Sequence, residues 1–343
     1  MAITLQVRDA RPVIAPKPNP VRTLVFVVAV LGIQLGFILS YVGAFHAPRA
    51  EGIEVLVVAP PAVQAQVVDQ LNAIPTAPVA ASAASSEEAA LASLRTADTS
   101  GVFIVDATGP QDTLTVASAG GSSIATALTT AFQQVDATQG RTITVQDVLP
   151  PQSGDGRGLT GFYLVTGWLV GGYLLAAVLG ILLGTTLVGV RQALTRIAVF
   201  IPYAVASGIG GALIVDQGLG ALTGHFWSVA GVGALVVMSA SMVTVGLQSF
   251  LGFIGVGITI VLFVVLGNPS AGGAYQQELL PTFWRTISQA LPNGAATTAI
   301  RHLVYFDAHQ VVPDLVSVDP YAITGAALTL LVSAIRGRQA VRS

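Results

Sequence analysis

Long apolar runs without a charged residue constrain this chain more than any other feature of its sequence. The run 23–45 is long enough to cross a lipid bilayer, which takes roughly 20 apolar residues in a helix. Only 9% of the residues are charged, whereas 53% are hydrophobic. We therefore expect an α-helical integral membrane protein with six transmembrane helices. The other five expected spans are 159–190, 197–215, 226–247, 249–267 and 320–335, the last beginning near Asp319.

The first apolar run follows a polar segment that contains four prolines. Residues 1–22 carry Arg8, Arg11, Lys17 and Arg22, and we interpret them as a disordered cytosolic tail. A secretory signal is the alternative for 23–45. Its apolar core is usually only about 7–15 residues and ends at a small-residue cleavage site, so we favour an uncleaved anchor.

Residues 46–158 predict a separate α/β (α+β) domain inserted between the first and second transmembrane helices. Short β-branched runs alternate with helical patterns, in the order β-α-(β)-α-β-β-α-β. The segment 113–117 alternates as an exposed edge strand does. Residues 150–158 form a flexible connector. The expected strands are 53–59, 101–106, 113–117 and 142–148, and the expected helices are 62–74, 86–97 and 122–135.

The sequence contains no recognisable catalytic constellation, and we do not expect an enzyme. The chain has no cysteine, one lysine (Lys17) and no phosphate-binding loop of the P-loop type, so no ATP, metal or other cofactor site is expected. The run Gly120-Gly121-Ser122-Ser123 opens a helix and offers an anion site at its N-terminus. Ordinary helix capping is the favoured alternative.

The segment 267–306 lies between two apolar runs, and it is too long for a turn and too apolar for a free loop. Breaks at Asn268-Pro269 with Gly272-Gly273, and at Pro292-Asn293-Gly294, bracket an expected helix at 279–291. We expect two half-buried helices on the outer membrane surface, joined at Pro292. A purely structural cap on the bundle is an equally weighted alternative. The residues expected on one apolar face are Phe283, Trp284, Ile287 and Leu291, and Trp284 and Tyr305 are typical of membrane–water interfaces.

The distribution of charge predicts the orientation in the membrane. With a cytosolic N-terminus, the inside segments are 1–22, 189–197 and 336–343, and they hold nine of the fifteen basic residues but only one acid, Asp9. Positive charge favours the cytosolic side. We therefore expect a multi-pass plasma-membrane protein with both termini cytosolic and with 46–158 and 267–306 outside. Few charges fall within the spans, which argues against a proton-coupled transporter.

The order of one membrane helix, a large insert and five further helices resembles type-2 ATP-binding-cassette exporter permeases, especially the phage-infection-protein (YhgE/Pip) branch. The resemblance implies a homodimer with a substrate path between protomers, powered by a separate cytosolic ATPase. The chain departs from that pattern in its proline-rich tail and its short loop at 189–197. The residues that carry the resemblance are Gly267-Asn268-Pro269-Ser270, Gly272-Gly273, Leu280-Pro281, Phe283-Trp284-Arg285, Leu291-Pro292, Gly294-Ala295, Arg301 and Tyr305-Phe306, with a weaker pattern at 101–103 and 114–132.

Two classes of function remain open on this reading. The first is an export permease for a hydrophobic or amphipathic envelope substrate, and the second is a non-transporting envelope protein that binds a partner through its insert. The partners expected are the lipid bilayer, a second copy and an ATPase, with no nucleic acid. We hypothesise that Arg285 or Arg301 pairs with Glu278 or a lipid headgroup and gates an outer exit. The candidate outer residues are Asn268, Pro269, Glu278, Trp284, Arg285, Pro292, Gly294, Arg301 and Tyr305. Arg191 and Arg196 are candidates for a cytosolic partner contact, although anchoring to lipid phosphates is the commoner role.

Overall fold

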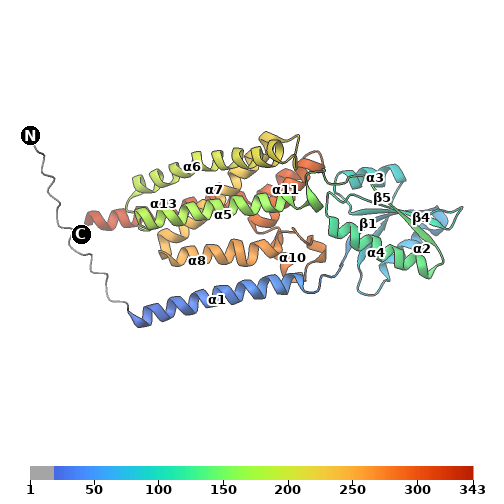
Figure 1. Cartoon of the computed structure of the whole chain (residues 1–343), viewed down its shortest axis with the longest axis horizontal. Helices are drawn as coiled ribbons and strands as arrows, with labels where there is room; N and C mark the ends of the chain where they lie inside the picture. Colours follow the sequence, from blue (N-terminus) through green and yellow to red (C-terminus); the bar gives the residue numbers. More distant parts are fainter. Residues whose placement is uncertain (1–18, 343) are drawn as a thin grey trace, which may run out of the picture.

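The structure, a computed structural model, describes residues 19–342. Residues 1–18, and with them most of the expected tail, lie outside this range. The described chain is elongated, with a bundle of apolar helices at one end and a small β-sheet at the other (Figure 1). The helices of the bundle are α1 (Pro20–Phe45), α5 (Thr160–Leu183), α6 (Val190–Ala212) with a π-helical end at Leu213–Gly218, α7 (Phe226–Leu251), α8 (Ile254–Ile260) with a π-helical end at Val261–Gly267, α9 (Asn268–Ser270), α10 (Thr282–Ser288), α11 (Pro292–Tyr305), α12 (Val311–Val316) and α13 (Asp319–Arg342).

Five of these stretches are long and apolar enough to span a membrane, which supports a membrane-embedded protein. The expected span 249–267 corresponds instead to a shorter apolar helix, Ile254–Ser270. The expected boundary between the spans 226–247 and 249–267, at Gln248, was wrong. Gln248 is buried within α7, and the turn comes at Gly252, whose positive φ of 64° suits only glycine readily. The five stretches are Thr23–Phe45, Thr160–Leu183, Val190–Gly218, Phe226–Leu251 and Val311–Arg342.

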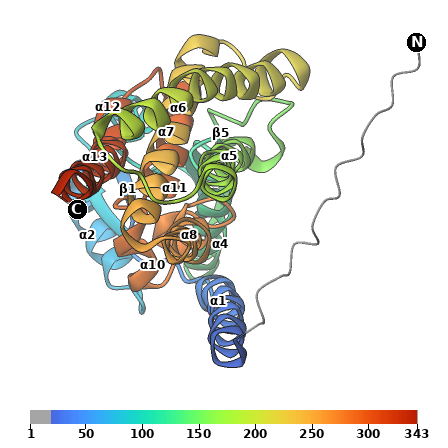
Figure 2. The same cartoon turned by 90° about the vertical axis from the view of Figure 1, so that its left-hand side faces the viewer.

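Helix α7 forms the centre of the bundle, whereas α1 lies at its edge. Most of α7 is buried between α5, α6 and α13. A Cβ added to Gly208 of α6 would lie 2.2 Å from the carbonyl oxygen of Ala230, so the backbones of α6 and α7 touch there. Helix α1 contacts the Ile254–Ser270 helix and leaves most of its side chains exposed. Figure 2 shows α1 at the edge of the bundle.

A five-stranded mixed sheet and three helices lie between α1 and α5 in the sequence, and we call residues 51–158 the sheet unit. The strands follow the order β2-β1-β3-β4-β5, with β3 and β4 antiparallel and the other neighbours parallel. The expected succession of strands and helices is confirmed, including the strand left open between the first two helices. The elements are β1 (Ile53–Val58), α2 (Pro61–Asn72), β2 (Val79–Ala83), α3 (Glu87–Arg95), β3 (Gly101–Ile104), β4 (Gln111–Val116), α4 (Ser122–Thr138), β5 (Thr142–Asp147) and a 3₁₀ turn, η1 (Gly156–Gly158).

The expectation of an exposed edge strand at 113–117 was wrong. Strand β4 lies inside the sheet, and Leu114, Thr115 and Val116 are all buried. The crossover through α4 returns β5 to the outer side of β4, so the edges of the sheet are β2 and β5. Alternation along one strand does not reveal such a non-local pairing.

The connections gather at two opposite ends of the bundle. The α5–α6 loop, residues 184–189, lies beside the C-terminal part of α13, where the amide of Gly189 donates to the carbonyl of Ser333 at 2.9 Å. At the other end, the loop between α6 and α7 meets the sheet unit, and the amide of Thr223 donates to Oε1 of Gln152 at 2.8 Å. We call these the terminal end and the sheet end (Figure 1).

The segment 267–306 differs from its expected form in three ways. The helix at 254–270 runs through Asn268-Pro269 and breaks at Gly272, where φ is +70°. The helix expected at 279–291 is a 3₁₀ turn, η4 (Gln277–Leu279), followed by α10, and Phe283 is exposed while Trp284 is buried. Helix α11 begins at the expected joint, Pro292, but most of it is buried against α5 and α7, so it is not the half-buried helix expected.

Candidate functional site

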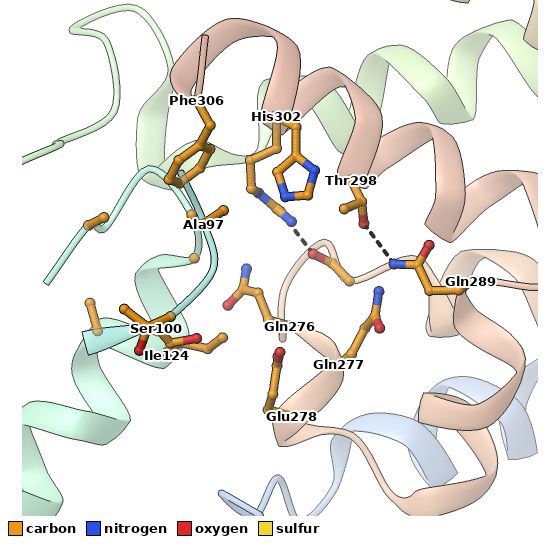
Figure 3. Close-up of a pocket in the computed structure, with 17 residues that line it drawn as sticks. Ala97, Ser100, Ile124, Gln276, Gln277, Glu278, Gln289, Thr298, His302 and Phe306 are labelled. Carbon is orange, nitrogen blue, oxygen red and sulfur yellow. Dashed lines mark hydrogen bonds between the residues drawn. The ribbon is translucent and has the colours of Figure 1, made fainter. Parts of the chain in front are cut away.

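A polar cavity of about 220 Å³ lies at the sheet end, between the sheet unit and the segment that contains α9 to α11 (Figure 3). Its walls come from the α3–β3 turn, the start of α4, the loop 272–278 and one face of α11. We call it the outer cavity. It is smaller than the roughly 300–1,000 Å³ typical of sites for drug-sized ligands. Its main polar lining residues are Gln276, Gln277, Glu278, Gln289, Arg301 and His302.

Arg301 supplies the positive charge of the outer cavity. Its Nη2 donates to the carbonyl oxygen of Gly272 at 3.1 Å, which ties α11 to the loop that follows α9. Burial lowers the pKa of the Arg301 guanidinium, but an arginine remains protonated in proteins. Acidic groups of the same chain oppose that lowering of the pKa, and these are Glu278, Asp155, Tyr305 and Asp314.

The pairing expected between an arginine and the Glu278 side chain is absent among the described residues. Arg285 instead donates to backbone carbonyls, through Nε to Gln277 at 3.1 Å and through Nη2 to Glu278 at 3.0 Å. The same Nη2 also donates to the carbonyl of Glu51, just before the first strand. Arg285 therefore fastens the chain that enters the sheet unit to α10. The carboxylate of Glu278 is left half-buried at the cavity wall.

A glutamine that the sequence did not single out joins the cavity to the sheet unit. Ser123 donates through its hydroxyl to Oε1 of Gln276, across 153 residues of sequence. A Cβ at Gly121 would lie within 2.5 Å of the Gln276 side chain, so glycine makes room for it. The start of α4, considered above for an anion, is thus covered by a side chain of the same protein. In the sequence, only the glycine pair at 120–121 indicated that another side chain could approach the start of α4 closely.

Tyr305 anchors the connector that leads out of the sheet unit. Its hydroxyl donates to Oδ2 of Asp155 at 2.7 Å, and the amide of Thr160 donates to Oδ1 at 2.8 Å. Asp155 is only 2% exposed. Burial raises the pKa of Tyr305, and the hydrogen bond to Asp155 raises it further. Tyr305 therefore makes an inward structural contact with this connector.

Two asparagines meet at the joint between α9 and α11. Nδ2 of Asn293 donates to Oδ1 of Asn268 at 2.8 Å and to the carbonyl of Phe263 at 2.9 Å. Asn293 is 1% exposed, and its Oδ1 has no partner in the described structure. Asn268 was a candidate, but its partner was not, because nothing in the sequence relates positions 25 residues apart.

The remaining outer candidates occupy packing positions around this joint. Pro269 lies in the first turn of α9 and Pro292 in that of α11, both buried. A Cβ at Gly294 would come within 2.1 Å of the carbonyl oxygen of Ser288, so glycine allows α10 and α11 to approach. Trp284 packs against Leu280 and against Ala44 of α1.

Arg191 and Arg196 lie far from the outer cavity, at the terminal end. They were expected in a loop at 189–197, and this was wrong, because both belong to the first two turns of α6. The actual loop is 184–189, bounded by Gly184 and Gly189 with φ of 82° and 86°. Arg191 is exposed, whereas Arg196 is only 7% exposed.

The outer cavity can therefore offer one cation, one carboxylate and several amides, a set that binds polar groups. Among residues 19–342 there is no cluster of three or more side chains that could hold a metal ion. The chain matches no protein-family model, no curated protein and no solved structure.

Proposed function

We propose that this chain is the membrane-spanning permease subunit of an exporter that moves a hydrophobic or amphipathic envelope substrate outward, driven by a separate ATPase and acting as a homodimer. In this proposal six helices cross the plasma membrane, both termini are cytosolic, and the sheet unit and the outer cavity face outward. The Ile254–Ser270 helix is the sixth crossing, with its polar end at Asn268.

The observation that carries the proposal is the outer cavity itself. It opens where an apolar bundle meets a folded unit, and it presents Arg301 and Glu278 on walls from different elements. A volume of about 220 Å³ suits the polar headgroup of an amphipathic molecule better than the whole molecule. We infer that the headgroup passes through the cavity while the apolar part remains in lipid.

The orientation in the membrane is tested by labelling introduced cysteines. Because the sequence contains no cysteine, only the introduced thiol can react. Cysteine replaces one exposed residue at a time: Glu88 in the sheet unit, Thr286 in α10 and Thr186 in the 184–189 loop. A thiol reagent that does not cross membranes should label the first two on intact cells and the third only after lysis. Labelling of position 186 on intact cells would overturn the orientation.

The transport role is tested by a reversible lock across the outer cavity. A Gly121→Cys, Gln276→Cys pair joins the sheet unit to the loop, because a Cβ at 121 would lie 2.6 Å from Cγ of Gln276. We expect an ATPase to co-purify with the chain, and its permease-stimulated hydrolysis to fall on oxidation and to return on reduction. Each single cysteine variant is the control. Purification without any ATPase, or hydrolysis unaffected by the lock, would refute the proposal.

One observation favours the second candidate, a non-transporting envelope protein that binds a partner through the sheet unit. The loop between α5 and α6 spans only residues 184–189, which leaves little surface for gripping an ATPase at the terminal end. If no ATPase co-purifies and an extracytoplasmic protein does, this second function replaces the first.

A further inference from the structure

A second cavity lies at the terminal end, opposite the outer cavity. It has a volume of about 590 Å³ and is formed by the end of α5, the 184–189 loop and the first turns of α6. We call it the terminal groove; Figure 2 views the molecule from this end. Its lining residues divide into an apolar set, Leu179, Leu183, Leu187 and Val199, and a polar set, Thr186, Arg191, Gln192, Thr195 and Arg196.

Arg196 is a buried cation without an acidic partner. It is 7% exposed, and its Nη2 donates to the carbonyl oxygen of Gly184 at 3.2 Å. A guanidinium has five N–H groups. In the described chain every aspartate and glutamate belongs to the sheet unit or to the loops and helices of the sheet end. Arg196 therefore has no acidic partner among residues 19–342, and its remaining N–H groups are available to an added anion.

The start of α6 adds to the positive electrostatic potential near Arg196. The N-terminus of α6, at Val190, has no side-chain cap, and its free amides carry the positive end of the helix dipole. The side-chain oxygens of Gln192 and Thr195 do not cap these amides, because both are engaged elsewhere. Oε1 of Gln192 accepts from the amide of Val188, and the Thr195 hydroxyl donates to the carbonyl of Arg191.

The depth of the site suits a lipid. Arg196 lies six residues into α6, which corresponds to roughly 9 Å along the helix axis from its first residue. In a bilayer whose surface lies at the start of α6, that depth is near the boundary between headgroups and acyl chains. Leu183 and Val199 are exposed along the groove, and so give an acyl chain an apolar wall.

We propose that the terminal groove binds an anionic phospholipid, with its phosphate held by Arg196 and Arg191 and one acyl chain lying along the apolar wall. Fork-shaped guanidinium groups favour phosphate oxygens. The proposal does not depend on a transport function. It differs from general attraction of surface arginines to the membrane, because Arg196 is buried whereas Arg338 and Arg342, at the same end, are exposed.

The test is lipid binding to the purified full-length chain in detergent, measured by native mass spectrometry and by thermal unfolding. The probes are phosphatidylglycerol and phosphatidylcholine with identical acyl chains. We expect phosphatidylglycerol to bind about tenfold more tightly and to stabilise the protein more. Arg196→Gln should abolish this preference, whereas Arg338→Gln, the matched exposed control, should retain it.

A second variant keeps the test decisive if Arg196→Gln does not fold. Thr186→Glu changes an exposed loop residue and supplies a carboxylate within the groove, so it should also remove the preference. Equal binding of the two lipids to the unmodified protein, or a preference that survives both variants, would overturn the proposal. Stabilisation by inorganic phosphate alone would assign the groove to a soluble anion and would equally overturn it.

Discussion

Arg196 is a buried arginine and Arg301 a partly buried one, at opposite ends of the bundle, and their surroundings differ. Arg301 lies among Glu278, Asp155 and Asp314, and it donates to the carbonyl of Gly272. Arg196 donates to one carbonyl of the chain and has no acidic neighbour in the described residues. A buried charge is costly unless it is compensated. The sheet end therefore compensates its cation internally, whereas the terminal end relies on its environment.

The comparison also separates the functions of the two ends. Internal compensation fixes the relative position of α11, the 272–278 loop and the connector at Asp155, so the sheet end is a rigid joint around a cavity. An uncompensated cation makes the terminal end responsive to the lipids around it. The following predictions test this difference, from the largest expected effect to the smallest.

Asp155→Ala should give the largest loss of stability. It leaves the Tyr305 hydroxyl and the Thr160 amide without their acceptor in a buried place, and it removes negative charge near Arg301. We expect a loss of about 3 kcal/mol, measured by thermal unfolding of the full chain in detergent. Tyr305→Phe removes one of the two hydrogen bonds and should cost about 1 kcal/mol. If Asp155→Ala is as stable as the unmodified protein, Asp155 does not hold a rigid joint at the sheet end.

Arg301→Met and Arg196→Met should have opposite consequences in detergent that lacks anionic lipid. The first removes the positive charge nearest Glu278 and Asp155, together with the hydrogen bond to Gly272, and should cost about 2 kcal/mol. The second removes an uncompensated cation, so it should be neutral or slightly stabilising. Thermal unfolding of both variants, with and without phosphatidylglycerol, measures the difference. If both variants lose the same stability without lipid, the contrast between the two ends is wrong.

Gly121→Val should loosen the sheet unit from the bundle without unfolding either part. Its side chain would collide with Gln276, which can move, so we expect a cost of about 1–2 kcal/mol. Hydrogen exchange in the first turn of α4 should rise. Gly156→Val is the matched control, because a Cβ there meets no atom within 4 Å and φ is not positive. Equal exchange in the two variants would argue against a tight junction at Gln276.

The sheet unit also contains one buried carboxylate that is paired with a cation and one that is not. Asp112 is buried and paired with Arg141, whereas Oδ2 of Asp136 is buried without a partner. Burial raises the pKa of Asp136 from 3.8 to about 6, and the nearby charge of Asp112 adds to the effect.

The sign of the resulting pH dependence follows from proton uptake. Between pH 3.8 and about 6 the folded protein holds more protons at Asp136 than the unfolded chain, so stability rises as the pH falls from 7 to 5. Asp136→Asn should stabilise the protein at pH 7.5 by about 1 kcal/mol and should flatten this part of the profile. Asp69→Asn, on the exposed face of α2, is the control. Thermal unfolding at both pH values measures the effect, and an unchanged profile in Asp136→Asn would contradict it.

Local patterns predicted the elements of this protein well. Apolar length predicted the long helices, and alternating or helical spacing predicted the strands and helices of the sheet unit, because both depend on neighbouring residues. The prediction failed where a single residue ended a helix, as Gly252 does in place of Gln248. It also failed for α11, whose moderate apolarity resembled a surface helix although the bundle buries it.

The sequence alone determined that the chain forms several helices long and apolar enough to span a membrane, and that a small mixed unit of strands and helices follows the first of them. Only the tertiary structure decided which charges are compensated. Asp155 meets Tyr305 across 150 residues, and Gln276 meets Ser123 across 153. Arg196 is isolated because α5, the loop and α6 pack around it. Compensation of a charge depends on distances between elements, and spacing along the chain does not encode those distances.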